Sequence, residues 1–350
     1  MRNRKHFSLL LRALTGGMLL VFLAARTAAA ATVQTTLNYS GPLPAGTTQV
    51  KVENLAGHVQ VTQGSGFAVT ATVVAGGSDQ AAAQTLARTV KLETSQSDGQ
   101  FIVHVYYPVD QYDSYWYAAA KTSGNSSSDD NGSVCFLGVI CVNGGGSSGL
   151  RYQDTGVRVY TGGERGTPLH VDLTIQVPAH MAFALTNYVG RSDLDTLQND
   201  VRVKTASGDA YGSNITGNFS ADTGSGDVHV KDASGSLHAD TGSGEVRAEN
   251  YTSGPSVWAD TGSGDVDLAG TLSARRKLYI DTGSGDATLR TSGALSLRLV
   301  ASSDSGELNI NLPDMSNVVT HRGSFSADFG KAEGKGTIST GSGDITVARP

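Results

Sequence analysis

The second half of this 350-residue chain repeats a five-residue motif, Thr-Gly-Ser-Gly-Asp or a close variant, directly before short runs of apolar residues. The clear copies begin at Thr223, Thr241, Thr261, Thr282 and Thr340. The acids that end six successive copies, from Asp209 to Glu307, are 18, 18, 20, 21 and 21 residues apart, and Asp344 follows 37 residues later. Self-similarity at this spacing is typical of proteins built from stacked repeats.

Each repeat contains two runs of alternating polar and apolar residues, such as Asp227 to Lys231 and Ser236 to Thr241, and each run follows a glycine turn. Alternation of this kind predicts half-buried strands. Such a unit cannot bury its own apolar face, so it must stack on its neighbours. We therefore expect an all-β, single-stranded β-solenoid, or β-helix, with coils of roughly 18 to 21 residues and two short strands per coil.

The alternation also predicts which side chains form the core of the stack. On the first strand of each coil these are Val228, Val230, Val246, Ala248, Val266, Leu268, Ala287, Leu289, Leu308, Ile310, Ile345 and Val347. On the second strand they are Phe219, Ala221, Leu237, Ala239, Val257, Ala259, Leu278, Ile280, Leu297 and Leu299.

Four segments of different composition follow one another along the chain. Residues 1–30 read as a signal peptide, and residues 31–109 hold fainter solenoid coils with one short helix near 79–88. Residues 110–167 form a Tyr-, Gly- and Ser-rich insertion, typical of flexible linker around a small loop. The main repeats occupy residues 168–350.

The N-terminal segment predicts export. A basic start (Arg2, Arg4, Lys5) precedes an apolar run at 18–25 and small residues at 28–30, as in a cleaved signal peptide. The alternative is an uncleaved membrane anchor, although the run is short for a span. No later segment has the length of a membrane helix, so we expect a mature protein that is periplasmic, secreted or held at the outer surface.

Only two cysteines occur, Cys135 and Cys141, both in the insertion. An oxidising compartment favours a disulfide that closes this small loop, and the alternative is a pair of buried thiols. The net charge of −6 and the lack of a basic stripe argue against nucleic acid as a partner.

The motif Asp-Thr-Gly-Ser-Gly-Asp-Val after a signal peptide resembles a bacterial family of candidate adhesins with β-strand repeats, a domain of unknown function. The Val-Glu-Asn-Leu-Ala-Gly-His-Val-Gln-Val stretch near residue 52 and the Val-Pro-Ala-His-Met stretch at 177–181 are similar to that family too. The resemblance covers most of residues 50–350 except the insertion. It implies the repeat architecture and an adhesin role.

The repeated acids are candidate calcium ligands. Alternation turns them outward in two columns beside the glycine turn, and stacked carboxylates about 5 Å apart repel one another by roughly 1 kcal/mol in water. Calcium would relieve this repulsion, and the alternative is that the acids are turn residues bonded to neighbouring amides. The candidate calcium ligands are Asp222, Asp227, Asp240, Glu245, Asp260, Asp265, Asp281 and Asp286.

A second candidate site is the aromatic cluster of the insertion. Exposed aromatic rings stack on sugars or anchor a protein partner, whereas buried ones would cap a flank of the solenoid. The candidate binding residues are Tyr112, Tyr115, Trp116 and Tyr117.

The sequence contains no convincing catalytic set, because its histidines are scattered and its acids recur in every coil. We therefore expect an exported, non-enzymatic β-solenoid that acts as an adhesin or envelope interaction protein and binds glycan or protein partners without a cofactor. One alternative is a polysaccharide-active β-helix enzyme. Another is a structural envelope component whose edge strands associate end to end.

Overall fold

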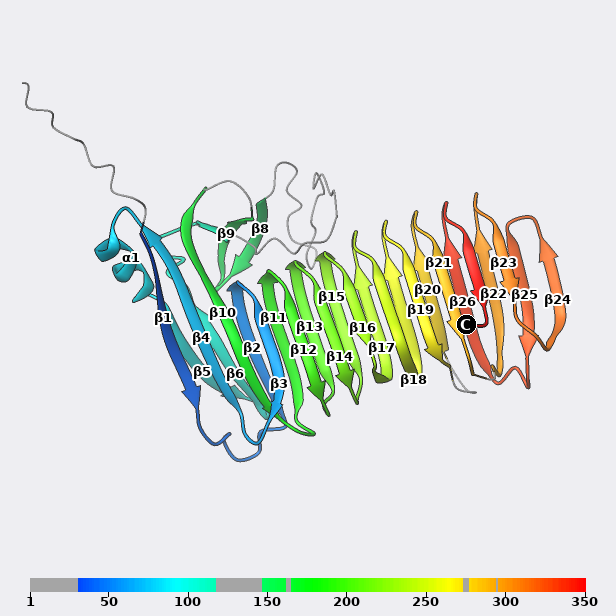
Figure 1. Ribbon diagram of the computed structural model, residues 1–350, viewed down its shortest axis with the longest axis horizontal. Coiled ribbons are helices and arrows are strands. Elements are labelled where there is room, and N and C mark those ends of the chain that lie inside the picture. The colour runs from blue at the N-terminus through cyan, green and yellow to red at the C-terminus, as the bar shows by residue number, and fades with distance from the viewer. Residues whose placement is uncertain (1–30, 118–146, 162–164, 273–276, 294) are drawn as a thin grey trace, which may run out of the picture.

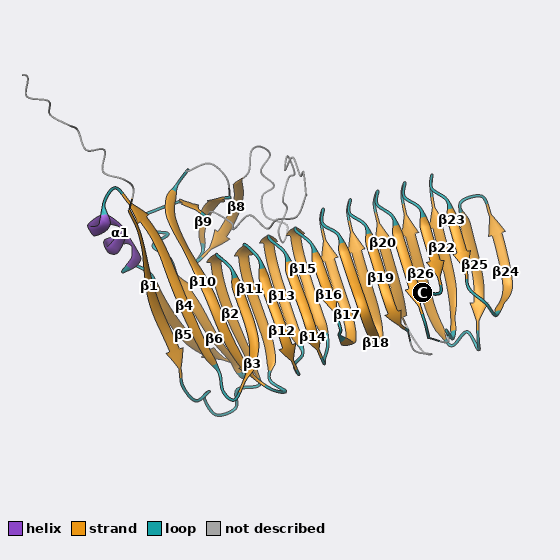
Figure 2. Ribbon diagram, in the orientation of Figure 1, coloured by secondary structure: helices purple, strands orange, loops and turns teal. Residues whose placement is uncertain are grey.

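The computed structural model describes residues 31–117, 147–161, 165–272, 277–293 and 295–350. These residues form a long stack of strands with one short helix at its N-terminal end (Figures 1 and 2). The expectation of an all-β, solenoid-like protein is confirmed. No helix in the described part of the chain is long and apolar enough to cross a membrane. Residues 1–30 and both cysteines lie outside the described residues.

The strands are short and follow one another closely along the chain. Up to the main repeats they are β1 Ala31–Ser40, β2 Gln49–Ala56, β3 Val59–Gly64, β4 Ala68–Gly77, β5 Lys91–Ser97, β6 Gln100–Tyr106, β7 Ser114–Trp116, β8 Ser147–Tyr152, β9 Thr155–Tyr160, β10 Thr167–Pro178 and β11 Ala182–Val189. In the first half of the repeats they are β12 Ser192–Leu197, β13 Val201–Ser207, β14 Ala210–Ile215, β15 Phe219–Ser225, β16 Val228–Lys231, β17 Ser234–Thr241, β18 Val246–Thr261 and β19 Val266–Thr271. The remaining strands are β20 Lys277–Thr282, β21 Ala287–Thr291, β22 Leu297–Ser303, β23 Leu308–Asn311, β24 Met315–His321, β25 Ser324–Phe329, β26 Gly334–Thr340 and β27 Ile345–Ala348.

Two rows of parallel strands face each other across the core. Row A runs in space through β6, β2, β11, β13, β15, β17, the second half of β18, β20, β26 and β22. Row B runs through β10, β3, β12, β14, β16, the first half of β18, β19, β21, β27 and β23. Neighbouring strands bring equivalent repeat residues side by side: Val228 pairs with Val246, and Val266 pairs with Ala287.

Antiparallel strands close both ends of the stack. At the N-terminal end, β4 lies between β1 and β10, and β5 pairs with β6. Helix α1 Gln80–Ala87 connects β4 to β5 and is capped by Asp79, whose side chain accepts a hydrogen bond from the Ala82 amide at 2.8 Å. At the C-terminal end, β25 pairs with β22, and β24 pairs with β25.

The last two strands of the chain are placed out of sequence order. β26 lies between β20 and β22, and β27 lies between β21 and β23. The final coil is therefore inserted between two earlier coils, which Figure 1 shows as red strands among orange and yellow ones. The backbone of the C-terminal segment completes hydrogen-bond ladders on both sides, so the end of the stack depends on it.

The core consists of the inward columns that alternation predicts, and nearly all of these side chains are buried. Leu308 and Ile310 are the exceptions, because they lie on β23, where row B ends, and they are only partly buried. The described part of the insertion contains three strands instead of linker alone. β7, β8 and β9 form a small sheet, which joins the main stack where Tyr115 pairs with Thr167 at the start of β10.

The Thr-Gly-Ser-Gly-Asp motif forms a corner between the two rows. The threonine hydroxyls point inward and bond along the stack: Thr261 Oγ1 donates to the Gly244 carbonyl at 2.8 Å and accepts from the Gly264 amide at 3.1 Å. Each turn approaches the next so closely that a Cβ at Gly264 would lie 1.9 Å from the Gly244 oxygen. This corner therefore has no room for a Cβ at Gly264, and the Thr261 hydroxyl joins the turns of Gly244 and Gly264.

Candidate functional site

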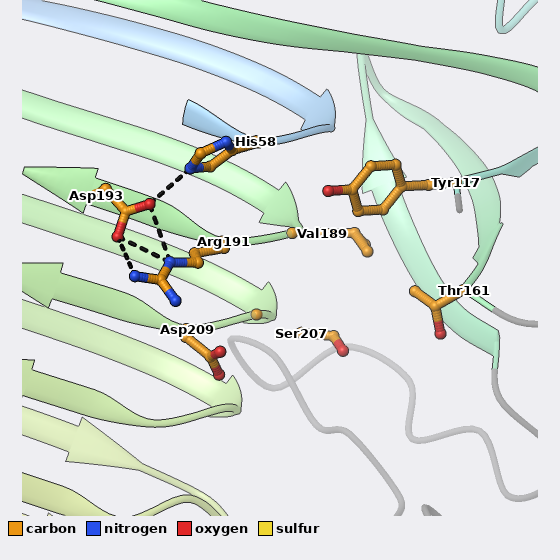
Figure 3. A pocket seen from close by; sticks show the side chains of 10 residues that line it. His58, Tyr117, Thr161, Val189, Arg191, Asp193, Ser207 and Asp209 are labelled. Carbon is orange, nitrogen blue, oxygen red and sulfur yellow. Dashed lines mark hydrogen bonds and ion pairs between the residues drawn. The ribbon is translucent and has the colours of Figure 1, made fainter. Parts of the chain in front are cut away.

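A cavity of about 370 Å³ lies where the insertion meets the corner of the first coils (Figure 3). The insertion contributes Tyr117 and Thr161, and the corner contributes the remaining side chains. The corner residues in the lining are His58, Val189, Gly190, Arg191, Asp193, Ser207, Gly208 and Asp209. A cavity of this size, with one apolar wall and convergent polar groups, is typical of a small-ligand site.

The charged floor of the cavity is the start of the corner's acid column. Val59 pairs with Ser192, Ser192 with Ala210, and Ala210 with Val228. The residues that precede these four strands, His58, Arg191, Asp209 and Asp227, therefore occupy equivalent positions in successive coils. The first two coils carry His and Arg where later coils carry an acid, so the cavity has a mixed charge that the rest of the column lacks.

Asp193 links the charged side chains of the floor. His58 Nε2 lies 2.6 Å from Asp193 Oδ2, and Arg191 Nε donates to both carboxylate oxygens at 2.8 and 2.9 Å (Figure 3). The Arg191 guanidinium also lies over the Tyr211 ring, 3.8 Å from its centroid. Paired in this way, the side chains are held in one arrangement, which lowers the entropy cost of binding a ligand.

The two carboxyl groups of the floor have opposite pKa shifts. Burial acts to raise the pKa of Asp193, but hydrogen bonds from His58 and Arg191 outweigh it, so the net shift is downward. For Asp209, burial is the largest effect and raises the pKa, although its carboxylate accepts a hydrogen bond from the Asp227 amide at 3.0 Å. Asp209 is therefore the acid in the lining that is more easily protonated.

Tyr117 forms the apolar wall of the cavity. It follows β7, its side chain is buried, and its ring meets the His170 ring edge to face at a centroid distance of 4.9 Å. Burial, with a smaller contribution from Asp172, raises the pKa of Tyr117 to about 12. The Asp172 carboxylate accepts from the His58 amide at 2.8 Å, which fixes the neighbouring loop.

The aromatic candidates of the insertion fall into two groups. Tyr115 and Tyr117 are buried, and the Tyr115 ring meets the Tyr107 ring edge to face at 5.4 Å. Tyr112 is exposed and Trp116 is partly buried. This burial favours the alternative in which Tyr115 and Tyr117 cover a flank of the solenoid. Binding through Tyr112 and Trp116 stays a prediction.

The repeated acids point outward as expected, and several are bonded to the protein itself. The carboxylates of Asp227, Asp265 and Asp286 each accept a hydrogen bond from a backbone amide of the next coil at 2.7 to 2.9 Å. Asp281 accepts from the Ser339 hydroxyl at 2.5 Å, and Asp222 lies 3.6 Å from Lys204 Nζ. The described residues contain no group of three or more side chains suited to hold a metal ion. These contacts match the turn-residue interpretation, and calcium binding stays a prediction.

Sequence reasoning missed the cavity because its parts are far apart in the chain. His58 and Asp193 are 135 residues apart, and Tyr117 belongs to the insertion. The sequence did hold one indication of the cavity. The position directly after the corner glycine carries an acid in the later coils, whereas the first two coils carry His58 and Arg191 there. The arrangement offers hydrogen-bond donors, acceptors and an aromatic wall, which together suit a polar ligand that contains a ring.

One solved structure and one family model are similar to this chain. A solved structure of a candidate cell adhesion protein from Clostridium sporogenes is similar at 10% identity, with 91% of this chain and 100% of that chain covered and a TM-score of 0.26. A likeness this weak carries no argument about function. No curated protein matches the chain. The family model Toastrack DUF4097 matches residues 170–348, so the chain belongs to the Toastrack DUF4097 family.

Proposed function

We propose that this protein is an exported, non-enzymatic binding protein of the cell envelope, and that the cavity between the insertion and the corner holds a short saccharide segment of its partner. The observation that carries the proposal is the composition of this cavity. Tyr117 and Val189 offer an apolar wall against which a sugar ring packs, and His58, Arg191, Asp193 and Asp209 surround it with donors and acceptors.

The pattern of acids supports binding over catalysis. A glycosidase places one pair of carboxyl groups around one bond. Here the acids of the corner column recur along the stack, and those at Asp209, Asp227, Asp265, Asp286 and Asp344 have the same bond to a backbone amide of the next coil. Their uniformity favours a structural role for the column.

A cavity-filling substitution tests the proposal. Ser207→Phe would place a ring in the cavity. Ser225→Phe makes the same change at the paired position one coil further on, outside the cavity lining. The backbone carbonyl of each serine accepts a hydrogen bond from an amide of the preceding coil, at 2.9 Å for Ser207 and 3.0 Å for Ser225. The two variants therefore perturb equivalent corners.

We expect the native protein and Ser225→Phe to bind the same glycans in an array of envelope polysaccharides, and Ser207→Phe to lose this binding while it keeps its melting temperature. Equal binding by both variants would contradict the proposal. So would the absence of binding by the native protein to any glycan of the array.

A further inference from the structure

A second concavity, of about 410 Å³, lies on the outer face of row A and has a positive lining. It faces outward from β2, β11 and β13, and none of its lining residues lines the cavity of Figure 3. Its charged side chains are Lys51, Glu53, Arg202 and Lys204. Three cations and one acid gather here on a chain whose net charge is −6.

The concavity exists because one coil carries short side chains between two coils with long ones. Ala184 of β11 pairs with Lys51 on one side and Arg202 on the other. Thr186 pairs with Glu53 and Lys204 in the same way. Ala184 and Thr186 thus form the floor, and the two charged walls are two strand spacings apart, about 9.5 Å.

The acid in the lining is already neutralised by its neighbours. Glu53 forms an ion pair with Lys51 and lies 2.9 Å from His104 Nδ1. The hydrogen bond from His104 is the largest cause that lowers the pKa of Glu53, to about 2, so this carboxylate stays charged and paired. The wall formed by β2 therefore contributes little net charge.

The opposite wall, β13, presents two cations on the same face. Arg202 is exposed and makes no ion pair with any residue of the described chain. Lys204 forms a partly exposed ion pair with Asp222, at 3.6 Å from Nζ to Oδ2, and its side chain is 24% exposed, so its ammonium group still faces solvent. A guanidinium and an ammonium side by side over a shallow floor match the geometry of an anionic oxygen group.

We propose that this concavity binds the anionic groups, phosphate or carboxylate, of an envelope polymer, with Arg202 and Lys204 as the principal contacts. The group sits over Ala184 and Thr186, where the short side chains leave room. Arg202 donates in a bidentate manner, and Lys204 adds a second charge-assisted bond. This site stands independently of the saccharide cavity, since the two share no lining residue.

The test compares two double variants that remove the same charge. Arg202→Gln with Lys204→Gln empties the proposed site, and Lys277→Gln with Lys335→Gln removes two paired lysines from the same row of strands, outside the concavity. The probes are poly(glycerol phosphate), polygalacturonate and neutral dextran, each titrated by calorimetry at low and high salt. Circular dichroism melts confirm that all variants are folded.

We expect the native protein to bind at least one anionic polymer, with weaker binding at high salt, and to ignore dextran. The first double variant should bind that polymer at least about tenfold more weakly, and the second should differ by less than about twofold. The polymer that binds tells whether the group is phosphate or carboxylate. A third variant, Ala184→Glu, places a carboxylate on the floor and should abolish binding with all cations retained.

Three results would overturn the proposal. The first is a native protein that binds neither anionic polymer at low salt. The second is an equal loss of binding in the two double variants, which would assign binding to net charge alone. The third is native-like binding by Ala184→Glu, which would place the ligand elsewhere.

Discussion

The threonine column at the corner should supply a measurable part of the stability of the stack, and Thr261→Val tests this. Thr261 is 1% exposed, and its hydroxyl bonds both the Gly244 carbonyl and the Gly264 amide. Valine has nearly the same shape but no hydroxyl, so it leaves one buried acceptor and one buried donor without this partner.

The size of the effect follows from these two bonds. A buried polar group that loses its partner costs about 1–3 kcal/mol, so the two groups left by Thr261→Val should destabilise the protein by about 2–6 kcal/mol. Thr223 makes one such bond within the described residues, to the Gly208 carbonyl at 3.2 Å, and Thr223→Val should cost about 1–3 kcal/mol. Thr288, on the outer face of β21, serves as a control, and its replacement by valine should change stability by less than about 0.5 kcal/mol.

The assay is urea unfolding followed by circular dichroism, with the shift in midpoint multiplied by the slope. Because repeat proteins can unfold coil by coil, hydrogen exchange of the Gly264 amide should be measured as well. Thr261→Val should speed this exchange. A midpoint equal to that of the Thr288 control, with unchanged exchange at Gly264, would refute the view that the column stabilises the corner through hydrogen bonds.

Three further outcomes follow from the geometry. Gly264→Ala should prevent soluble expression or lower the melting temperature sharply, because its Cβ would lie 1.9 Å from the Gly244 oxygen. The control is Gly66→Ala, whose Cβ would have no atom within 4 Å, and it should melt as the native protein does. The pKa of Glu53 is lowered from 4.5 to about 2, so the stabilising effect of this carboxylate is complete above about pH 4.5 and is lost as the pH falls towards 2. Glu53→Gln should therefore flatten the fall of the urea midpoint with acid. The same fall of the midpoint in the variant and the native protein would contradict this prediction. Removal of β26 and β27 should expose β22 to β25 to limited proteolysis, and a digestion pattern like that of the full chain would show that the inserted coil is dispensable.

The sequence predicts the repeating part of the fold well, because one alternation serves both the local strand and the global stack. Val228, Val246 and Val266 are buried in neighbouring strands, as the alternation of the repeats indicates. Local preference and global packing agree at these residues.

The order of the coils at the C-terminal end could not be predicted in this way. The 37-residue step to Asp344 indicates that a coil is skipped, yet the coils carry similar residues at equivalent positions, so their order in the stack does not follow from the repeat motif. The choice of neighbour depends on β24 and β25, which turn back as an antiparallel pair and take the place that the last coil would otherwise fill. The candidate cavity could not be predicted for a similar reason. Tyr117 lies in it because β7 pairs with β9, a contact between segments far apart in the chain.

The most direct test of the binding account is to measure retention and turnover of a glycan in the same sample. The protein is incubated with the envelope polysaccharides that it binds, the complex is isolated, and new reducing ends are counted over hours. The account predicts stable binding that Ser207→Phe abolishes and Ser225→Phe preserves, with no increase in reducing ends over a protein-free control. A time-dependent release of reducing ends by the native protein that Ser207→Phe abolishes would contradict it and would identify the cavity as the active site of an enzyme.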